Sequence, residues 1–362
     1  MQSATKQNAI WKKLYRNKTA MVGIVVIFIT VLVAVFGYVI APDNSVDADL
    51  QTVEIQSKPM GYVQQFLKIA NATKEPKTLS TIFFGNKNEF KFLPIKSFTI
   101  KQDSIAVQKY IDEDTAVLQV YSINTVTNNN PTNLQAQIVS KKYLLGTDAF
   151  GRDILSRLII GTRVSLLVGL ITVVISLTIG ILLGAFAGYY KGKIDAVIMW
   201  FINVTWSIPT LLLVFAITLT LGKGFWQIFI AIGLTLWVSV ARLVRGQVLA
   251  LKELEYVQAA RALGFKDIRI IFKHILPNII GPVLVIAAGN FATAIIVEAG
   301  LSFLGIGVQP PQPSWGLMIK ENYNLIITNN AAQALIPGFA IMLLVLAFNL
   351  LGNGLRDAVS NN

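Results

Sequence analysis

Ionisable side chains in the second half of the chain are concentrated in one stretch, residues 255–277. The stretch lies between long apolar segments and carries acids, bases and the single histidine of the chain, namely Glu255, Arg261, Lys266, Asp267, Arg269, Lys273 and His274. A charge at the centre of a bilayer costs about 3 kcal/mol. We therefore expect this stretch to lie outside the membrane, between two spanning helices, where its chemistry is the recognition of a partner.

Local signals within the stretch predict two short helices. Residues 255–263 are rich in good helix formers, and Gly264 stands where a left-handed residue commonly ends a helix. Asp267 is expected to cap a second short helix. The small pair Ala259 and Ala260 gives the first helix a shallow waist that another surface can approach closely. A short helix of this kind typically binds in a groove of a partner protein.

The composition indicates a membrane protein. Of the 362 residues, 54% are hydrophobic and 14% are charged, whereas soluble domains average about 25% charged residues. The net charge of +12 could indicate a nucleic-acid partner, but Lys and Arg on the cytoplasmic side of a membrane explain it more simply. We therefore expect contact with membrane lipid and none with nucleic acid.

Several catalytic chemistries are excluded by residues that the chain lacks. It has no cysteine and one histidine, which excludes disulfides, thiol nucleophiles, thiolate metal sites and multi-histidine metal centres. The Gly-Lys pair at 222–223 lacks the frame of a phosphate-binding loop, and that frame occurs nowhere else in the sequence. The sequence therefore predicts no catalytic residue, no metal site, no bound cofactor and no ATP hydrolysis by this chain itself.

Apolar segments of spanning length predict six transmembrane helices. The first, at 21–41, follows a basic N-terminal tail at 1–20, and its length favours an uncleaved helix over the shorter apolar core of a signal peptide. The other spans are expected at 165–189, 196–221, 228–249, 279–299 and 334–351. Lys and Arg are in excess in the tail, in the turn at 189–195, in the charged stretch and at Arg356. Both termini are therefore expected in the cytoplasm.

Residues 42–143 differ from the rest because they are polar and numerous enough to form a small core of their own. Their pattern predicts strands at 97–100, 105–111 and 116–123, a helical turn or two at 64–70 and a loop at 128–131. We expect a compact extracytoplasmic insertion, β-rich or α+β, rather than a disordered loop. The chain as a whole is expected to be an all-α polytopic membrane protein that carries this insertion, with residues 144–362 forming a five-helix core.

Some residues inside the predicted spans are candidates for the pathway or its gating. Pro209 interrupts the third span and is expected to kink it, either as a flexing point or as a fixed structural feature. Asn290 and Glu298 are the polar members of the fifth span, and ionisable groups within a membrane commonly serve a transport pathway. Glu298 lies near the outer end, where helix capping or loop anchoring is an equal alternative. The second span also carries a stripe suited to close helix packing, made up of Gly180, Gly184 and Gly188.

The charged stretch resembles the signature of permease subunits from ATP-binding-cassette (ABC) importers. Gln258-Ala259-Ala260, Gly264 and Leu276-Pro277 match its Glu-Ala-Ala, glycine and Leu-Pro positions, while Gln258 replaces the usual Glu and His274 the usual Ile. In that family the segment is a cytoplasmic coupling helix that docks onto a separate ATPase subunit. The resemblance implies a docking surface formed by Glu255, Gln258, Ala259, Ala260, Arg261 and Gly264, with Pro277 setting the angle into the fifth span.

A second stretch, residues 141–166, resembles the C-type branch of the dipeptide, oligopeptide and nickel permeases. Its motif residues are Gly146, Asp148, Gly151, Arg152 and Asp153. Asp153 is suited to cap a short helix, and the acids and arginines of the motif, together with Arg157, have spacings that allow ion pairs. A structural clasp is favoured over a substrate site. The phrases WKKLYRNKTAMVGIVVI and LSFLGIGVQPPQPSW resemble the same branch.

The resemblance implies a permease subunit of an ATP-driven ABC importer in a bacterial cytoplasmic (inner) membrane. Its partners would be a second permease subunit in a heterodimer, two ABC ATPase subunits that bind ATP and Mg, and an extracytoplasmic solute-binding protein. Peptides are the expected substrate, and nickel or another small solute is the alternative within the same architecture. An ATP-independent secondary transporter is an alternative of another class, but such proteins usually bury several ionisable groups, and only Glu298 qualifies here.

Overall fold

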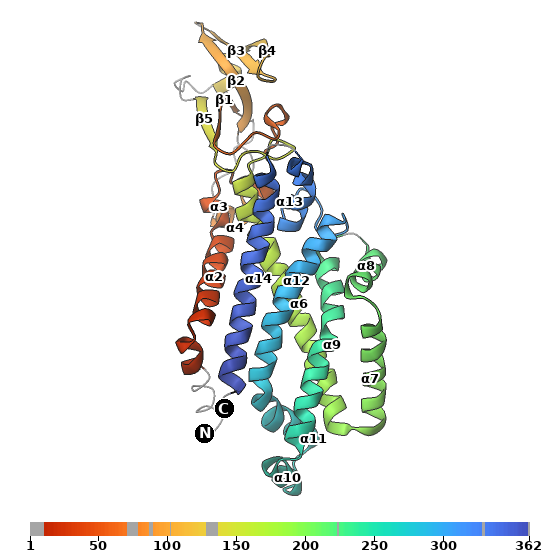
Figure 1. The fold of residues 1–362 in the computed structure, drawn as a ribbon. Coiled ribbons are helices and arrows are strands. Elements are labelled where there is room, and N and C mark those ends of the chain that lie inside the picture. The colour runs from red at the N-terminus through yellow and green to blue at the C-terminus, as the bar shows by residue number, and fades with distance from the viewer. Residues whose placement is uncertain are drawn as a thin grey trace. The chain divides into compact units, whose positions relative to one another are not determined.

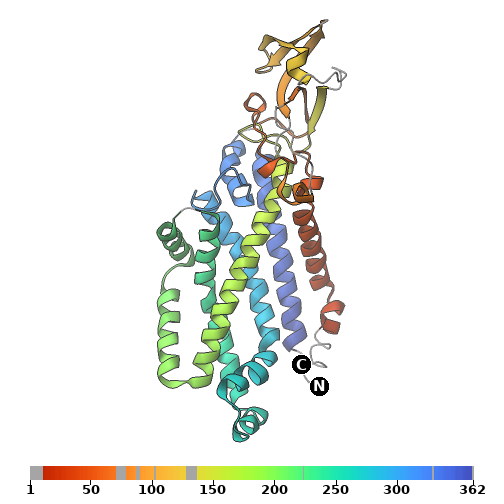
Figure 2. The ribbon, with the colours of Figure 1, turned by 180° about the vertical axis from the view of Figure 1, so that it is seen from behind.

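A computed structural model describes residues 11–70, 79–86, 90–101, 103–127, 137–222, 224–327 and 330–360. The chain forms two compact units, whose elements are drawn in Figures 1 and 2. Unit 1 comprises Met1–Val31, Ser165–Gln309 and Ala340–Asn362, and unit 2 comprises Leu32–Val164 and Pro310–Phe339. The predicted loop at 128–131 lies outside the described residues, as does the first half of the N-terminal tail.

Unit 1 is built from long helices, several of which lie side by side in both views (Figures 1 and 2). The helices that lie wholly or partly in this unit are α2 (Lys18–Val35), α6 (Ile154–Tyr190), α7 (Gly192–Ser207), α8 (Thr210–Leu221), α9 (Phe225–Lys252), α10 (Glu255–Ala262), α11 (Asp267–Ile270), α12 (Ile280–Phe303) and α14 (Ala331–Ser360). A π-helical turn, Ile271–Ile275, and a 3-10 turn, Leu276–Ile279, join α11 to α12.

Among the described residues, five helices are long and apolar enough to cross a membrane: α2, α6, α9, the run Asp267–Phe303 and α14. A sixth candidate is the pair α7 and α8, which is bent by 98° at a short break. Pro209 lies in this break, where it has no N–H with which to continue the bonding of α7. The mostly helical fold is thus confirmed with five to six spans, and the expected kink of the third span is a full break.

Close packing of α6 against α9 depends on the predicted glycine stripe. A Cβ atom at Gly184 would collide with the carbonyl oxygen of Ala241, and one at Gly188 would lie 2.8 Å from that of Arg245. At Gly180 the added carbon would collide with the side chain of Val240. Hydrogen in place of a side chain therefore allows the two helices to approach each other closely, as the four-residue spacing predicted.

Unit 2 contains a five-stranded antiparallel sheet. Its strands are β1 (Tyr62–Ala70), β2 (Phe90–Ile100), β3 (Ser104–Tyr110), β4 (Ala116–Ser122) and β5 (Ile138–Tyr143), in the order β4-β3-β2-β1-β5. One face buries Leu67, Ile95 and Ile105 together with Val126 of the short helix α5 (Ile123–Thr127). The insertion is therefore β-rich, which was one of the two folds predicted for it.

The prediction of a helical turn at 64–70 is wrong, because these residues belong to β1. β1 lies between β2 and β5, and its neighbours Phe66 and Leu67 are both fully buried, each on a different face of the sheet. A strand that is buried on both faces loses the alternation of polar and apolar residues by which strands are recognised. The remaining helices of unit 2 are α3 (Gly37–Ile40), α4 (Leu79–Phe84) and α13 (Trp315–Asn322).

Candidate partner-docking site

The helix α10 ends as its sequence predicts. Gly264 adopts a left-handed conformation with φ +77°. The N–H of Gly264 donates to the carbonyl of Arg261 at 3.0 Å, and the N–H of Phe265 donates to that of Ala260 at 3.2 Å. This pair of bonds is a Schellman motif, which satisfies carbonyls that the end of a helix leaves without partners. The chain therefore turns sharply at Gly264 and returns towards α12.

Asp267 does not cap the second helix, contrary to the prediction. It lies inside α11, whose N-cap residue is Lys266, and among the described residues no side-chain hydrogen bond caps that helix. The Asp267 carboxylate accepts a hydrogen bond of 2.6 Å from the hydroxyl of Tyr189, at the end of α6. A tertiary partner has thus replaced the local role that the sequence indicated, and the bond ties the segment after α10 to α6.

The two alanines of the predicted waist face different surroundings. Ala260 is buried, with 5% of its surface exposed, in an apolar cluster that includes Val257 on the same helix and Ile270 and Ile271 beyond the turn. Ala259 is exposed. The small size of Ala260 therefore serves the packing of this chain on itself, and Ala259 is the member of the pair that a partner can reach.

The exposed face of α10 combines charge with a large apolar surface. Glu255, Gln258 and Arg261 are exposed on the helix. After the helix ends, Leu263 is 74% exposed, and Ile268 in α11 is 62% exposed. Large apolar side chains rimmed by polar ones commonly mark an interaction surface. The sequence motif did not include Leu263 and Ile268, although bulky aliphatic residues in a segment expected to lie outside the membrane were a signal for them.

Ion pairs and hydrogen bonds connect the flanks of α10 to the neighbouring helices. Lys191, in the turn after α6, pairs with Glu253 at 2.9 Å, and the Lys252 ammonium donates to the carbonyl of Tyr189. The single histidine, His274, stacks on Phe265 with ring centroids 5.9 Å apart. Displacement of α10 would therefore pull on the end of α6 as well as on α12.

Pro277 lies in the 3-10 turn between the π-helical turn and α12. A proline cannot donate to the carbonyl four residues before it, and π turns occur where the regular helical bonding is interrupted. Residues 267–303 nevertheless form one continuous run of helical turns. The docking segment is thus joined directly to α12, through a stretch whose helical geometry changes three times, from α to π, to 3-10 and back to α.

In unit 2 the motif residues form a cluster of buried ion pairs. Arg152 donates to Asp148 at 2.6 Å and to Glu321 on α13 at 2.6 Å. Asp49 accepts a third bond from Arg152 at 3.2 Å, and Arg157 lies 3.3 Å from Glu321. Burial acts against the charge of Arg152, but the carboxylates of Asp148 and Glu321 outweigh it and raise the pKa of the guanidinium. The arrangement is a clasp between distant segments, and the sequence missed Asp49 and Glu321 because nothing local connects them to the motif.

The other motif residues shape the chain around the clasp. Gly146 and Gly151 both have positive φ, and a Cβ atom at either would collide with backbone atoms, those of Lys58 and Thr52 respectively. Asp153 accepts from the backbone N–H of Ser156 at 3.0 Å and so caps α6. The helix that it caps was expected to be short, but it extends from Ile154 to Tyr190. Burial raises the pKa of Asp153.

The three candidate pathway residues lie apart from one another along unit 1. Asn290 is buried on α12 and donates to the carbonyl of Leu236 on α9 at 3.4 Å. Glu298 lies about two turns further along α12, and its carboxylate accepts a hydrogen bond of 2.6 Å from the hydroxyl of Ser302. The same hydroxyl accepts a hydrogen bond from the backbone N–H of Val308. Glu298 thus helps to anchor the loop after α12, one of the two roles expected for it, whereas Pro209 lies at the break between α7 and α8.

Comparison with known proteins gives two family matches. Residues 180–362 match the family described as binding-protein-dependent transport system inner membrane component. Residues 7–59 match the N-terminal transmembrane domain of oligopeptide transport permease C.

Three relatives illustrate the range of names in this group. The chain is 43% identical over 221 residues to the glutathione transport system permease protein GsiD of Pectobacterium atrosepticum, covering 61% of this chain and 73% of that protein. It is 43% identical to the dipeptide transport system permease protein DppC of Alkalihalophilus pseudofirmus, over 64% of this chain and 75% of that protein. It is 41% identical to the oligopeptide transport system permease protein OppC of Bacillus subtilis, over 61% of this chain and 72% of that protein.

Proposed function

The chain belongs to the family of binding-protein-dependent transport system inner membrane components, and we propose that it is a permease subunit of an ATP-driven peptide importer. In this role it forms half of a translocation pathway and docks separate ATPase subunits through α10. The observation that carries the proposal is the outward face of α10, where Glu255, Gln258 and Ala259 lie beside the exposed Leu263.

The proposed partners follow from this division of labour. Two ABC ATPase subunits bind ATP and Mg, a second permease subunit completes the pathway, and a solute-binding protein delivers the substrate from outside. The chain spans the cytoplasmic (inner) membrane of a bacterium with both termini and α10 in the cytoplasm. Its contribution is mechanical rather than enzymatic, in keeping with the absence of a phosphate-binding loop from its sequence.

Contacts around α10 suggest how closure of the ATPases reaches the membrane helices. A displacement of α10 passes to α12 through the continuous run of turns at Asp267–Phe303. It passes to α6 through the bond between Tyr189 and Asp267 and through the pair of Lys191 and Glu253. Two neighbouring helices are therefore moved by one docking event, which is what a switch between outward and inward access requires.

Peptides are the proposed substrate because relatives over 40% identical carry dipeptide, oligopeptide and glutathione permease names. Uptake in a strain that lacks this chain tests the proposal, with a labelled oligopeptide compared against nickel. The wild-type chain is expected to restore peptide uptake, and Ala259→Arg is expected not to, because a long charged side chain on the outward face of α10 blocks docking.

The same uptake assay contains the outcomes that contradict the proposal. Restoration of nickel uptake alone would keep the importer and change its substrate. Uptake that persists without the ATPase subunits and stops with a protonophore would identify a secondary transporter instead. Equal restoration of peptide uptake by the wild-type chain and by Ala259→Arg would show that the outward face of α10 does not dock the ATPases.

A further inference from the structure

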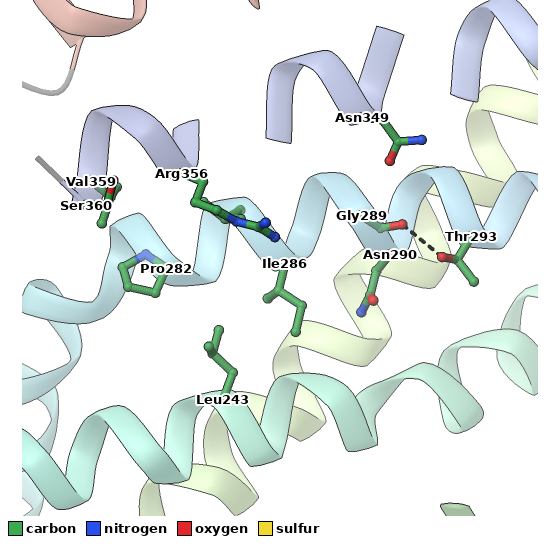
Figure 3. Close-up of a pocket in the computed structure, with 11 residues that line it drawn as sticks. Leu243, Pro282, Ile286, Gly289, Asn290, Thr293, Asn349, Arg356, Val359 and Ser360 are labelled. Atoms are coloured by element: carbon green, nitrogen blue, oxygen red, sulfur yellow. Dashed lines mark hydrogen bonds between the residues drawn. The ribbon is translucent and has the colours of Figure 1, made fainter. Parts of the chain in front are cut away.

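A pocket of about 570 Å³ lies within unit 1 between α9, α12 and α14 (Figure 3). Its volume is within the range of about 300–1,000 Å³ that is typical of small-molecule sites. α12 forms one wall with a stripe of uncharged residues at helical spacing, Pro282, Ile286, Gly289 and Thr293. The space in front of Gly289 is open, because a Cβ atom there would meet nothing within 4 Å.

Two polar side chains of α14 line this pocket without a partner of their own. Within the described part of the chain, neither the Asn349 amide nor the Arg356 guanidinium has a hydrogen bond or an ion pair. Figure 3 shows Arg356 extending from α14 along the face of α12 over Ile286, with Asn349 further along near Gly289 and Thr293. Both side chains are exposed. Asn349 lies within the predicted sixth span, where a polar group is costly in lipid and normally faces a partner or a water-filled cavity.

The spacing of these groups matches the length of a short peptide. Asn349 and Arg356 are seven residues apart, which is about two helical turns, so they share a face of α14 at a separation of roughly 10 Å. An extended chain covers about 3.3–3.6 Å per residue. A peptide of about three residues can therefore reach from one group to the other.

The chemistry of the lining discriminates between the candidate solutes. The eleven lining residues include one cation, Arg356, and no carboxylate, imidazole or sulfur ligand, so they offer nothing that would hold a nickel ion. An amide side chain both donates and accepts, which suits a peptide backbone whatever its side chains are. A guanidinium pairs with a carboxylate in a bidentate manner. Apolar residues such as Leu243 and Val359 line the remaining wall, which can therefore accept peptide side chains of different kinds.

We propose that this pocket is a subsite of the translocation pathway for peptides with a free C-terminal carboxylate. Arg356 binds the carboxylate, and Asn349 hydrogen-bonds the backbone about three residues away. The proposal rests on the function proposed above and adds to it the chemical group that the permease itself selects.

The test compares a labelled tripeptide with the same tripeptide amidated at its C-terminus. Uptake is measured in vesicles that contain the complete transporter with its ATPases and binding protein, for the wild type, Arg356→Gln and Arg356→Lys. The acid-to-amide uptake ratio of each variant is divided by that of the wild type, which cancels any preference of the binding protein. Arg356→Gln is expected to lower the ratio about tenfold, because a charge-assisted pair is lost, whereas Arg356→Lys keeps most of it.

Arg16→Gln is the matched control, since Arg16 is exposed two residues before α2 and does not line the pocket. An unchanged ratio for Arg356→Gln would overturn the subsite. So would a loss of both uptakes that occurs only in vesicles containing anionic phospholipid, because Arg356 would then bind a lipid headgroup. If the wild type imports neither peptide, the proposed function fails instead of the subsite.

A second measurement does not depend on the assembly of Arg356 variants. Because the chain has no cysteine, Asn349→Cys introduces its only thiol. The free tripeptide is expected to slow alkylation of this thiol by a maleimide more than the amidated tripeptide does. Equal rates with both peptides would contradict the placement of the peptide beside Asn349.

Discussion

The charged residues of α10 and those around Arg152 differ in what they face. On α10, Glu255 and Arg261 are exposed, whereas Arg152 and Asp148 in unit 2 are 2% and 1% exposed and lie in direct contact. Charged side chains are almost never fully buried unless they are paired. The buried group therefore holds this chain together, and the exposed group beside a bare apolar surface is available to another chain.

The largest expected effect comes from breaking the buried cluster. Arg152→Leu leaves the carboxylates of Asp148 and Glu321 in place without the guanidinium that bonds to both. Removing one partner of a buried ion pair costs roughly 3–5 kcal/mol. We expect a large drop in the thermal midpoint, measured on the detergent-purified protein by loss of the monodisperse peak after heating.

The matched control for this variant is the exposed pair beside α10. Glu253→Gln removes the ion pair with Lys191, in which both side chains are largely exposed. Exposed pairs contribute little because water and salt screen them. The control is therefore expected to melt like the wild type. Equal melting of Arg152→Leu and the wild type would show that the buried cluster does not stabilise unit 2.

A smaller effect separates the two neighbouring alanines of α10. Arginine at Ala260 overfills an apolar cluster in which the alanine is buried, and overpacking of a core typically costs about 1–3 kcal/mol. Arginine at the exposed Ala259 is expected to change stability by less than about 0.5 kcal/mol. Limited proteolysis of the segment around α10 measures the difference, with faster cleavage expected for Ala260→Arg. Equal cleavage of the two variants would place Ala260 outside the core.

The smallest expected effect concerns Asp153 at the start of α6. Burial raises the pKa of its carboxyl above the ordinary value of 3.8, so the folded chain binds more protons at this site than the unfolded chain does. Stability from this group therefore falls as the pH rises from 3.8 through the raised pKa, and the loss persists above it. Asp153→Asn keeps a good helix cap without a charge.

Melting curves between pH 4 and pH 7 test this expectation. The variant is expected to lose part of the downward slope of stability with pH that the wild type shows. A slope identical to that of the wild type would show that Asp153 has the same pKa in the folded and unfolded states.

Features that depend on neighbouring residues in the sequence were predictable. The left-handed Gly264 follows from its position after a run of helix formers, and the stripe from Gly180 to Gly188 follows from its spacing. Apolar segments of spanning length gave the helices of unit 1, because a bilayer requires each of them to satisfy its own backbone bonds. The alternation in β3 and β4 likewise gave two strands near their observed positions.

Features that depend on distant residues were not predictable. Asp267 has the sequence of a helix cap but bonds to Tyr189, 78 residues away. Glu321 bonds to Arg152 across 169 residues, and the buried face of α10 is defined only by what packs on it. Local pattern therefore identified the α10 segment as a docking candidate but did not determine which of its two alanines faces outwards.

Site-specific cross-linking tests most directly whether α10 docks the ATPase subunits through its outward face. Because the chain has no cysteine, Ala259→Cys on the exposed face and Ala260→Cys in the core each introduce a single thiol. With a bifunctional thiol reagent and ATPases that carry single cysteines along their permease-facing surface, a covalent product is expected from position 259 and none from position 260. No product from position 259 with any of these ATPase cysteines, although the complex is assembled and imports peptide, would contradict docking through this face.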